Sequence, residues 1–558
     1  MPAGLSTWSH ASEPAKGPPG KEAAKGPPGG IIVSRETTFI TEPLRKDGTV
    51  DYLAALNQRY SQGVTPENNA AVLFLQAMGP GEINKDIRER FFKMLGIAPL
   101  PEKGPYLEEF TKYFERKHPG GAAPNDDQRP DVAETAQKQY DQIMDRPWTK
   151  DEFPVAARWL EENQKQIDLI VEATKRPRHY VPLMTERDEP GMLIAVLLPV
   201  VQQSREAARC LRSRAMFRVG SGKSAEAWQD LLACHRLARL VGEGAFFVDG
   251  LVAIAIEGIA IHGDAVLAHE GKLTAGQAQR FAAELRKLPP MGKMVDKINW
   301  SERFMFLDCV YAVARKGPAE ISKLSWAPPA RGRFDWLFSV VTANKMAGAP
   351  PDKGRFDWLN RLVGAVLIDW NEPMRMGNQW YDRLVAGMSK PNRKERDAAL
   401  AQFERDLKKA AAGAKDLRVL LGNISSAGSL RGGLGRQMGH IFIALLMPAI
   451  SACVIAEDRA VTSEGMVQVL FALAAYRADH GSYPADLAAL VHKYLPAIPE
   501  DLFSGGPVRY KREDKGYIVY SVGINRKDDG GRTRWDDPDA EDSEGSDDYA
   551  IRVPGKKQ

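Results

Sequence analysis

The chain has 558 residues, of which 44% are hydrophobic and 27% are charged, and its formal net charge is +4. A chain of this length and composition can bury at least two ordinary hydrophobic cores. Its small net charge argues against a dedicated nucleic-acid-binding protein, which would carry a concentrated basic surface.

The first 35 residues are predicted to form a disordered tail. The hexamer A-K-G-P-P-G occurs at 15–20 and again at 24–29. Proline and glycine at this density cannot bury enough apolar surface to offset the chain entropy lost on folding. The tail also lacks the basic start and apolar core of a signal peptide.

Residues 36–440 are predicted to form a large helical domain, because apolar side chains recur at helical spacing through most of this range. The segment P-E-N-N at 66–69 precedes A-A-V-L-F-L-Q-A-M and is typical of a capped helix start, and Thr274 is a second N-cap candidate. An irregular insertion near 316–360 contains G-R-F-D-W-L twice, at 332–337 and 354–359. We expect its aromatic side chains to dock on the helical core, and an exposed binding surface is the alternative.

The stretch R-V-G-S-G-K-S-A-E-A-W at 218–228 contains the G-K-S of a phosphate-binding loop. That loop needs a glycine where Phe217 stands, and it must follow a strand, whereas the preceding residues have helical spacing. We therefore predict a turn at Gly222 between two helices, similar to one tetratricopeptide-type hairpin. A single unit predicts a hairpin and not a solenoid.

The four cysteines are far apart in sequence, and none lies in a CxxC pair. They are predicted to be buried free thiols, without a disulfide framework or a thiolate metal site. These residues are Cys210, Cys234, Cys309 and Cys453.

The longest apolar run, residues 441–456, contains Pro448 and is shorter than the roughly 20 residues that a membrane-spanning helix needs. We interpret it as a buried helix, with a marginal membrane anchor as the alternative.

Residues 441–558 are predicted to form a small α+β module at the end of a mainly α chain. A helix with one apolar stripe runs from Arg459 to His480, where Gly481 ends it. Two alternating, aromatic-rich runs, V-R-Y-K-R and Y-I-V-Y-S-V, predict a hairpin, and Y-A-I-R-V predicts a third strand after an acidic loop at 528–548. The expected module is one long helix packed on a three-stranded antiparallel sheet.

Three segments of this module resemble the C-terminal region of type II secretion major pseudopilins. They are L-A-A-Y-R-A-D-H-G-S-Y-P-A-D-L-A-A-L, then Y-L-P-A-I-P-E-D-L-F-S-G-G-P-V-R-Y, then Y-S-V-G-I-N-R-K-D-D-G-G. The resemblance covers residues 457–553. The upstream segments I-T-E-P-L-R-K-D-G-T-V-D-Y-L-A-A-L-N and G-V-T-P-E-N-N-A-A-V resemble large proteins of planctomycete bacteria that carry the same tail, and this second resemblance implies no biochemical activity.

In the pseudopilin family the loop before the last strand commonly binds calcium. Carried over by position, the resemblance implies a calcium site with carbonyl oxygens near Val522 and five side chains: Asn525, Asp528, Asp529, Asp547 and Asp548. Calcium takes six to eight hard oxygen ligands, which short Asp side chains on a bent loop can supply. An EF-hand is excluded, because Lys527 would occupy a ligand position. The alternative is a plain acidic loop that mutual repulsion keeps extended.

The chain departs from the pseudopilin pattern at the start of the long apolar segment. A pseudopilin has a glutamate five residues into that helix, whereas G-R-Q-M-G-H-I-F-I-A-L-L-M-P-A-I-S lacks it and lies mid-chain. We therefore do not expect processing or polymerisation as a pilin.

Sequence signatures of enzymes are absent. The segment H-E-G-K-L at 269–273 breaks the zinc-binding HExxH pattern at its last position, and the chain contains no G-x-S-x-G motif. The expected function is a non-catalytic scaffold or interaction protein, associated with the cell envelope or with secretion, whose protein partners the sequence does not name. The alternatives are a cytoplasmic helical adaptor with a degenerate pilin-like domain and an unrecognised enzyme.

Overall fold

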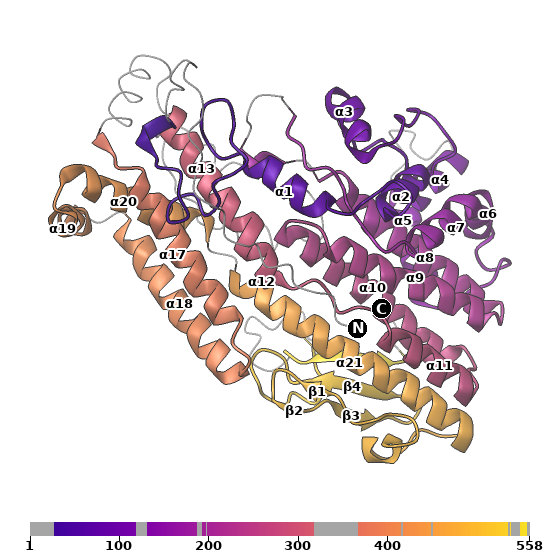
Figure 1. The fold of residues 1–558 in the computed structure, drawn as a ribbon. Helices are drawn as coiled ribbons and strands as arrows, with labels where there is room; N and C mark the ends of the chain where they lie inside the picture. The colour runs from indigo at the N-terminus through magenta and orange to yellow at the C-terminus, as the bar shows by residue number, and fades with distance from the viewer. Residues whose placement is uncertain are drawn as a thin grey trace.

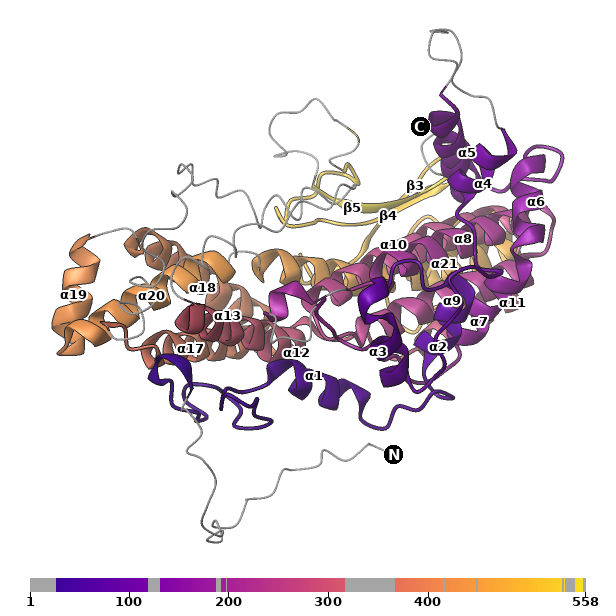
Figure 2. The same ribbon diagram turned by 90° about the horizontal axis from the view of Figure 1, so that it is seen from above.

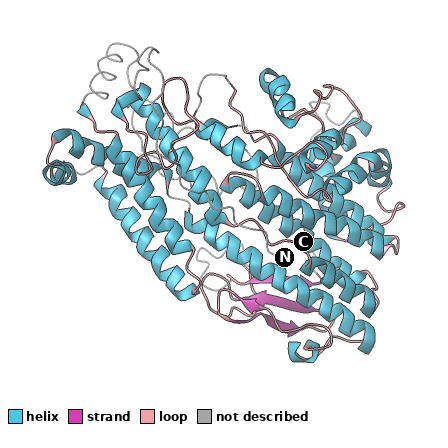
Figure 3. Cartoon of the chain, viewed as in Figure 1, coloured by secondary structure: helices cyan, strands magenta, loops and turns pink. Residues whose placement is uncertain are grey.

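The computed structural model describes residues 27–118, 131–186, 192–196, 198–316, 367–414, 417–447, 450–533, 536 and 547–554. The predicted fold class is confirmed: the described chain is mainly helical, with a small antiparallel sheet near the C-terminus (Figure 3). Seen from above, the molecule is elongated, with α19 at one end and α6 at the other (Figure 2). The tail to residue 26 and the repeated G-R-F-D-W-L segments lie outside the described residues.

The first third of the chain forms short helices, most of which lie on one side of the longer helices of the centre (Figure 1). They are the 3-10 turn η1 (Pro28–Gly30), α1 (Tyr52–Ser61), α2 (Ala70–Met78), α3 (Lys85–Leu95), α4 (Phe110–Lys117), α5 (Val132–Asp145), α6 (Pro154–Glu162), α7 (Gln164–Ala173) and the 3-10 turn η2 (Leu193–Ala195). The predicted capped start of α2 is confirmed, because the side chain of Asn69 accepts a hydrogen bond from Ala71 N at 3.1 Å.

The central helices form the body of the molecule. They are α8 (Val200–Gly220), α9 (Ser224–Gly242), α10 (Phe247–Glu270), α11 (Ala275–Arg286), α12 (Met294–Lys297), the π-helix η3 (Ile298–Glu302) and α13 (Arg303–Lys316). The predicted hairpin is confirmed as α8 and α9, and Gly222 has the positive φ of 73° that its turn requires. Thr274 caps α11 through reciprocal bonds with Gln277 of 3.2 and 3.0 Å.

The last part of the chain begins with helices that lie apart from the central hairpin and ends in the sheet (Figure 1). Its elements are α17 (Asn371–Met388), α18 (Arg393–Gly413), α19 (Leu417–Ala427), α20 (Leu430–Leu446), α21 (Ile450–His480), the 3-10 turn η5 (Leu487–Leu490), β1 (Glu500–Asp501), β2 (Gly506–Pro507), β3 (Arg509–Arg512), β4 (Tyr517–Ser521) and β5 (Tyr549–Val553). The three-stranded sheet has the order β3-β4-β5, and both pairings are antiparallel, as predicted.

Two sequence-based boundaries were wrong. The run at 441–456 is not one helix, because α20 ends at Leu446 and α21 begins at Ile450, nine residues before the predicted start. Part of the predicted disordered tail is packed: Ile31 is buried, and Ile32 N donates to the side chain of Asn371 on α17 at 2.8 Å. Ile31, at the end of the Pro-Gly segment, supplies buried apolar surface that the rest of the tail lacks, whereas the side chain of Ile32 is exposed.

The buried apolar side chains of the described residues form two clusters, in agreement with the expected minimum of two. One cluster contains residues from the helices α2 through α11, from α21 and from the three-stranded sheet. The other contains residues from α1, α13, α17 and α20. All four cysteines are buried free thiols, which confirms their prediction. The C-terminal sheet therefore shares its core with the central helices.

The helix α21 is buried on every side in its middle. Residues 466–475 include nine side chains that are at most 5% exposed, and α21 packs on α10, on α11 and on β4. The sequence predicted one apolar stripe facing the sheet. The structure places helices of the body against the opposite face, so α21 is the element that joins the module to the body (Figure 1).

Candidate functional site

The acidic loop leaves the sheet at Gly523 and returns to it at Asp547. Gly523 has a φ of 64°, and a Cβ atom there would lie 2.0 Å from the carbonyl oxygen of Asp547. Asp548 N donates to the carbonyl oxygen of Arg532 at 3.1 Å. The two ends of the loop therefore touch at one edge of the sheet, and a residue larger than glycine does not fit at 523.

The first part of the loop folds over the outer face of β4. Side chains alternate along a strand, so Tyr517 and Val519 face the core, whereas Ile518 and Tyr520 face outward. Ile518 and Tyr520 are nevertheless buried, because Gly531 lies against both side chains. The loop consequently takes part in the packing of the sheet and is not a solvated linker over its described residues.

Three of the five predicted ligand residues form one hydrogen-bonded group. Asp529 Oδ2 accepts from Asn525 Nδ2 at 2.9 Å and from Asp547 N at 3.1 Å. Asp547 Oδ2 accepts from Asn525 N at 3.0 Å. The structure thus brings side chains from the two ends of the loop together, beside the antiparallel pair β4 and β5.

Of the five predicted ligands, Asp548 has the least compensated carboxylate. Its side chain is 2% exposed, Oδ2 accepts from Gly531 N at 2.7 Å, and Oδ1 is buried without a hydrogen-bond partner. Burial, together with the charges of Asp529 and Asp528, raises the pKa of Asp548 to about 6. A buried carboxylate oxygen that lacks a donor costs free energy, and a cation would offset that cost.

The fifth predicted ligand, Asp528, has partners on the sheet. Its Oδ1 accepts from Tyr520 Oη at 3.0 Å, and its Oδ2 forms an ion pair with Arg509 at 2.8 Å. Asp528 is therefore held away from the group around Asp529 by two contacts of its own.

The donor set fits a hard cation chemically, since it consists of carboxylate and amide oxygens with one of them buried and unsatisfied. The geometry does not yet form a coordination shell, because Asp529 and Asp547 are turned towards N–H donors. Over the described ranges, no three His, Cys, Asp or Glu side chains are arranged to hold a metal ion. A calcium ion would require these carboxylates to rotate towards Asp548.

Ion pairs connect the C-terminal module to the helical body. The sequence did not predict them. Arg526, with a φ of 60° in the loop, pairs with Asp397 of α18. Asp458 of α21 pairs with Arg393 at 3.1 Å and with Arg396 at 2.7 Å, both on α18. These contacts span 62 to 129 residues of sequence, so no local pattern predicts them.

The G-K-S and H-E-G-K-L segments, which lack the full nucleotide-binding and zinc-binding patterns, have structural roles. Ser224 of the G-K-S segment donates to the carbonyl oxygen of Gly271 at 2.5 Å and so fixes the start of α9. His269 of the H-E-G-K-L segment lies 2.9 Å from Tyr483 Oη, on the boundary between the body and the module.

Among the described helices, α10 alone is long and apolar enough to cross a membrane. In the structure it is a core helix that carries the buried carboxylates of Glu257 and Asp264. His235 of α9 lies between them, with Nδ1 2.9 Å from Glu257 and Nε2 2.8 Å from Asp264.

Comparison with models of protein families, with curated proteins and with solved structures gives no match for this chain.

Proposed function

We propose that this chain is a non-catalytic interaction protein, in which a helical body holds a pseudopilin-like module and presents its acidic loop to a protein partner associated with the cell envelope or with secretion. The observation that carries the proposal is the burial of α21 between the sheet and the body.

The burial of α21 favours a fixed module over an assembling one. An amphipathic helix that packs only on its own sheet leaves its other face free for a second copy of the chain. Here that face lies against α10 and α11, with Phe471 edge-on to the rings of Trp228 and Phe281 at 5.4 and 6.0 Å. The apolar surface available for polymerisation is thus used within the chain.

The loop is the part of the module best placed for recognition. Its start is anchored to α18 through Arg526, and its two ends are held by the group around Asp529. Loop ends that are already held in one conformation lose less entropy when a partner binds.

Calcium is the proposed ligand of the loop. Asn525, Asp529, Asp547 and Asp548 would hold it, and Asp528 would join them only if it left Arg509. The bound cation would neutralise carboxylates that otherwise repel one another. The chain's own residues would supply the fixed loop ends and the buried oxygen of Asp548.

Purification of partners from native cells through the full chain tests the interaction function. We expect a defined protein to be enriched about tenfold or more by the wild-type chain, and to be lost when Asp529, Asp547 and Asp548 are all changed to Asn. The control is Asp486→Asn, which lies in the same module and only caps η5. Equal recovery with the triple variant would contradict the proposed role of the loop.

A further inference from the structure

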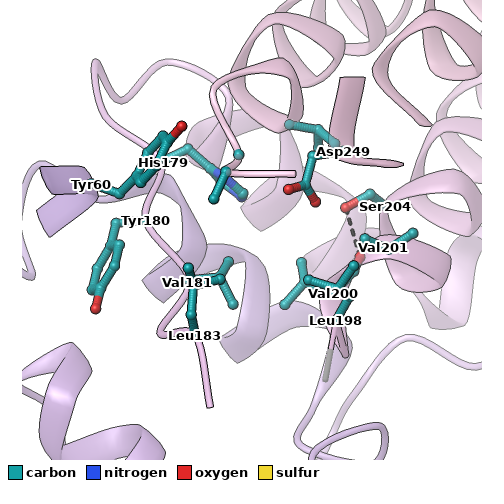
Figure 4. A pocket seen from close by; sticks show the side chains of 13 residues that line it. Tyr60, His179, Tyr180, Val181, Leu183, Leu198, Val200, Val201, Ser204 and Asp249 are labelled. Atoms are coloured by element: carbon teal, nitrogen blue, oxygen red, sulfur yellow. Dashed lines mark hydrogen bonds between the residues drawn. The ribbon is translucent and has the colours of Figure 1, made fainter. Parts of the chain in front are cut away.

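A hollow of about 40 Å³ lies in the helical body, far in sequence from the acidic loop (Figure 4). About 10–15 Å³ is enough to hold one water molecule, so the hollow has room for roughly three to four groups of that size. Most of its wall is apolar and comes from the 181–183 segment and from α8 and α9, with Val181, Leu183, Leu198, Val200, Val201 and Val241 among the lining residues.

Two polar side chains, Asp249 and His179, face each other across this hollow (Figure 4). Asp249 Oδ2 accepts from Phe246 N at 2.9 Å, while Oδ1 has no hydrogen-bond partner among the described residues. The imidazole of His179 also forms no hydrogen bond with any described residue. Burial lowers the pKa of His179 to about 4, so its ring is neutral at pH 7 and can accept a hydrogen bond.

Several charged side chains lie around the hollow. Lys297 donates to the carbonyl oxygen of Gly244, a lining residue, and burial lowers the pKa of this lysine. The positive charge of Arg178 partly offsets the negative charge of Glu243. The carboxylates that act on Lys297 are Glu243, Asp249, Asp296 and Glu302. Burial raises the pKa of Asp249, an effect that the charge of Lys297 partly offsets, and burial raises the pKa of Glu302 to about 8, so that Glu302 is mostly protonated at pH 7.

The π-helix η3 shapes the same region. It places Ser301 so that its hydroxyl donates to the carbonyl oxygen of Ala245, a lining residue, at 2.6 Å. It also places Glu302 so that its carboxylate accepts from Phe247 N at 3.3 Å, two residues before Asp249. A π-helix is rare and is found frequently at functional sites, because it re-aims side chains at a local cost in helix geometry.

We propose that this hollow binds a small primary ammonium ligand. The ammonium group donates to the free oxygen of Asp249 and to the neutral ring of His179, and the short alkyl body lies against the valine and leucine wall. The site belongs to the helical body and does not depend on the function proposed for the acidic loop.

Titration of the full chain with n-propylammonium tests the site, with the ¹³C methyl signals of valine and leucine as the readout. Propan-1-ol and propionate are the neutral and anionic probes of the same size. We expect saturable shifts at Val181, Val200 and Val241, and an affinity for the ammonium probe about tenfold or more above that for the alcohol, because a charge-assisted hydrogen bond is the stronger one. Equal affinity for the alcohol, preference for propionate, or no saturable shift would overturn the proposal.

Two variants separate the charge of the site from its shape. Asp249→Asn keeps an acceptor for Phe246 N and should remove the preference for the ammonium probe. Asp131→Asn is the matched control, since Asp131 also accepts a hydrogen bond at a helix N-terminus but lies on the surface. Val201→Phe should block the hollow and abolish binding with Asp249 in place. Unchanged ammonium affinity in either Asp249→Asn or Val201→Phe would contradict the proposed site.

Discussion

Replacing Asp230 by alanine is expected to lower the free energy of unfolding by about 3–5 kcal/mol, the usual cost of leaving a buried charge without its partner. Asp230 is fully buried on α9 and accepts from Arg214 at 2.6 Å and from Arg218 at 2.6 Å, both on α8. Without it, the buried guanidinium of Arg214 keeps only Asp168, at 2.5 Å.

Asp168 provides the matched control, because it binds the same guanidinium from a half-exposed position. An exposed ion pair contributes about 0–1 kcal/mol, so Asp168→Ala should cost no more than that. Urea unfolding of the two variants measures the difference. Equal losses for Asp230→Ala and Asp168→Ala would mean that burial does not decide the strength of this network.

Replacing Trp228 by alanine is expected to cost about 3–5 kcal/mol and to destabilise the body and the C-terminal module together. Trp228 is fully buried, stacks on Phe281 of α11 at 4.6 Å and meets Phe471 of α21 at 5.4 Å. Its Nε1 donates to Glu284 at 2.6 Å. One side chain therefore connects three helices of the shared core.

Unfolding followed with two probes measures this coupling, with circular dichroism for the helices and hydrogen exchange for the sheet. Both should shift together in Trp228→Ala, because the helices from α2 through α11 share one core with α21 and the sheet. Trp380→Ala is the control, since Trp380 is partly exposed and packs on Phe403 in the other cluster. A sheet that keeps its stability in Trp228→Ala would contradict the shared core.

Local signals in the sequence predicted much of the fold. The caps at 66–69 and Thr274, the turn at Gly222 and the alternation in β3 and β4 each act over a few residues. The segment at 441–456 was misjudged as one helix, although Pro448, a helix-breaking residue, lies between the end of α20 at Leu446 and the start of α21 at Ile450.

Long-range packing could not be predicted in the same way. The second buried face of α21 depends on α10 and α11, which are separated from it by more than 150 residues of sequence. The pair of Arg526 with Asp397 and the facing of His179 and Asp249 likewise depend on tertiary structure. At the acidic loop, the pair of Asp528 with Arg509 also depends on tertiary structure, and the sequence did not predict it.

Thermal unfolding of the full chain, with calcium or with a chelator at pH 7 and pH 5, tests the cation site most directly. At 100 times the dissociation constant, calcium should add about 2.7 kcal/mol of stability. In chelator the folded-state pKa of Asp548, about 6, lies above the ordinary value of 3.8. The folded state therefore favours the protonated form of Asp548, and this contribution to the free energy of unfolding is present at low pH and lost as the pH rises through 6. Relative to Asp548→Asn, the wild type should gain about 1 kcal/mol between pH 7 and pH 5 in chelator.

With calcium bound, the pH dependence should reverse, because protons then compete with the cation for Asp548. The control Asp486→Asn should behave as the wild type under all four conditions. We expect a calcium-dependent rise in melting temperature that Asp548→Asn removes. An unchanged melting temperature with calcium, or the same rise in Asp548→Asn, would contradict it and leave a plain acidic loop.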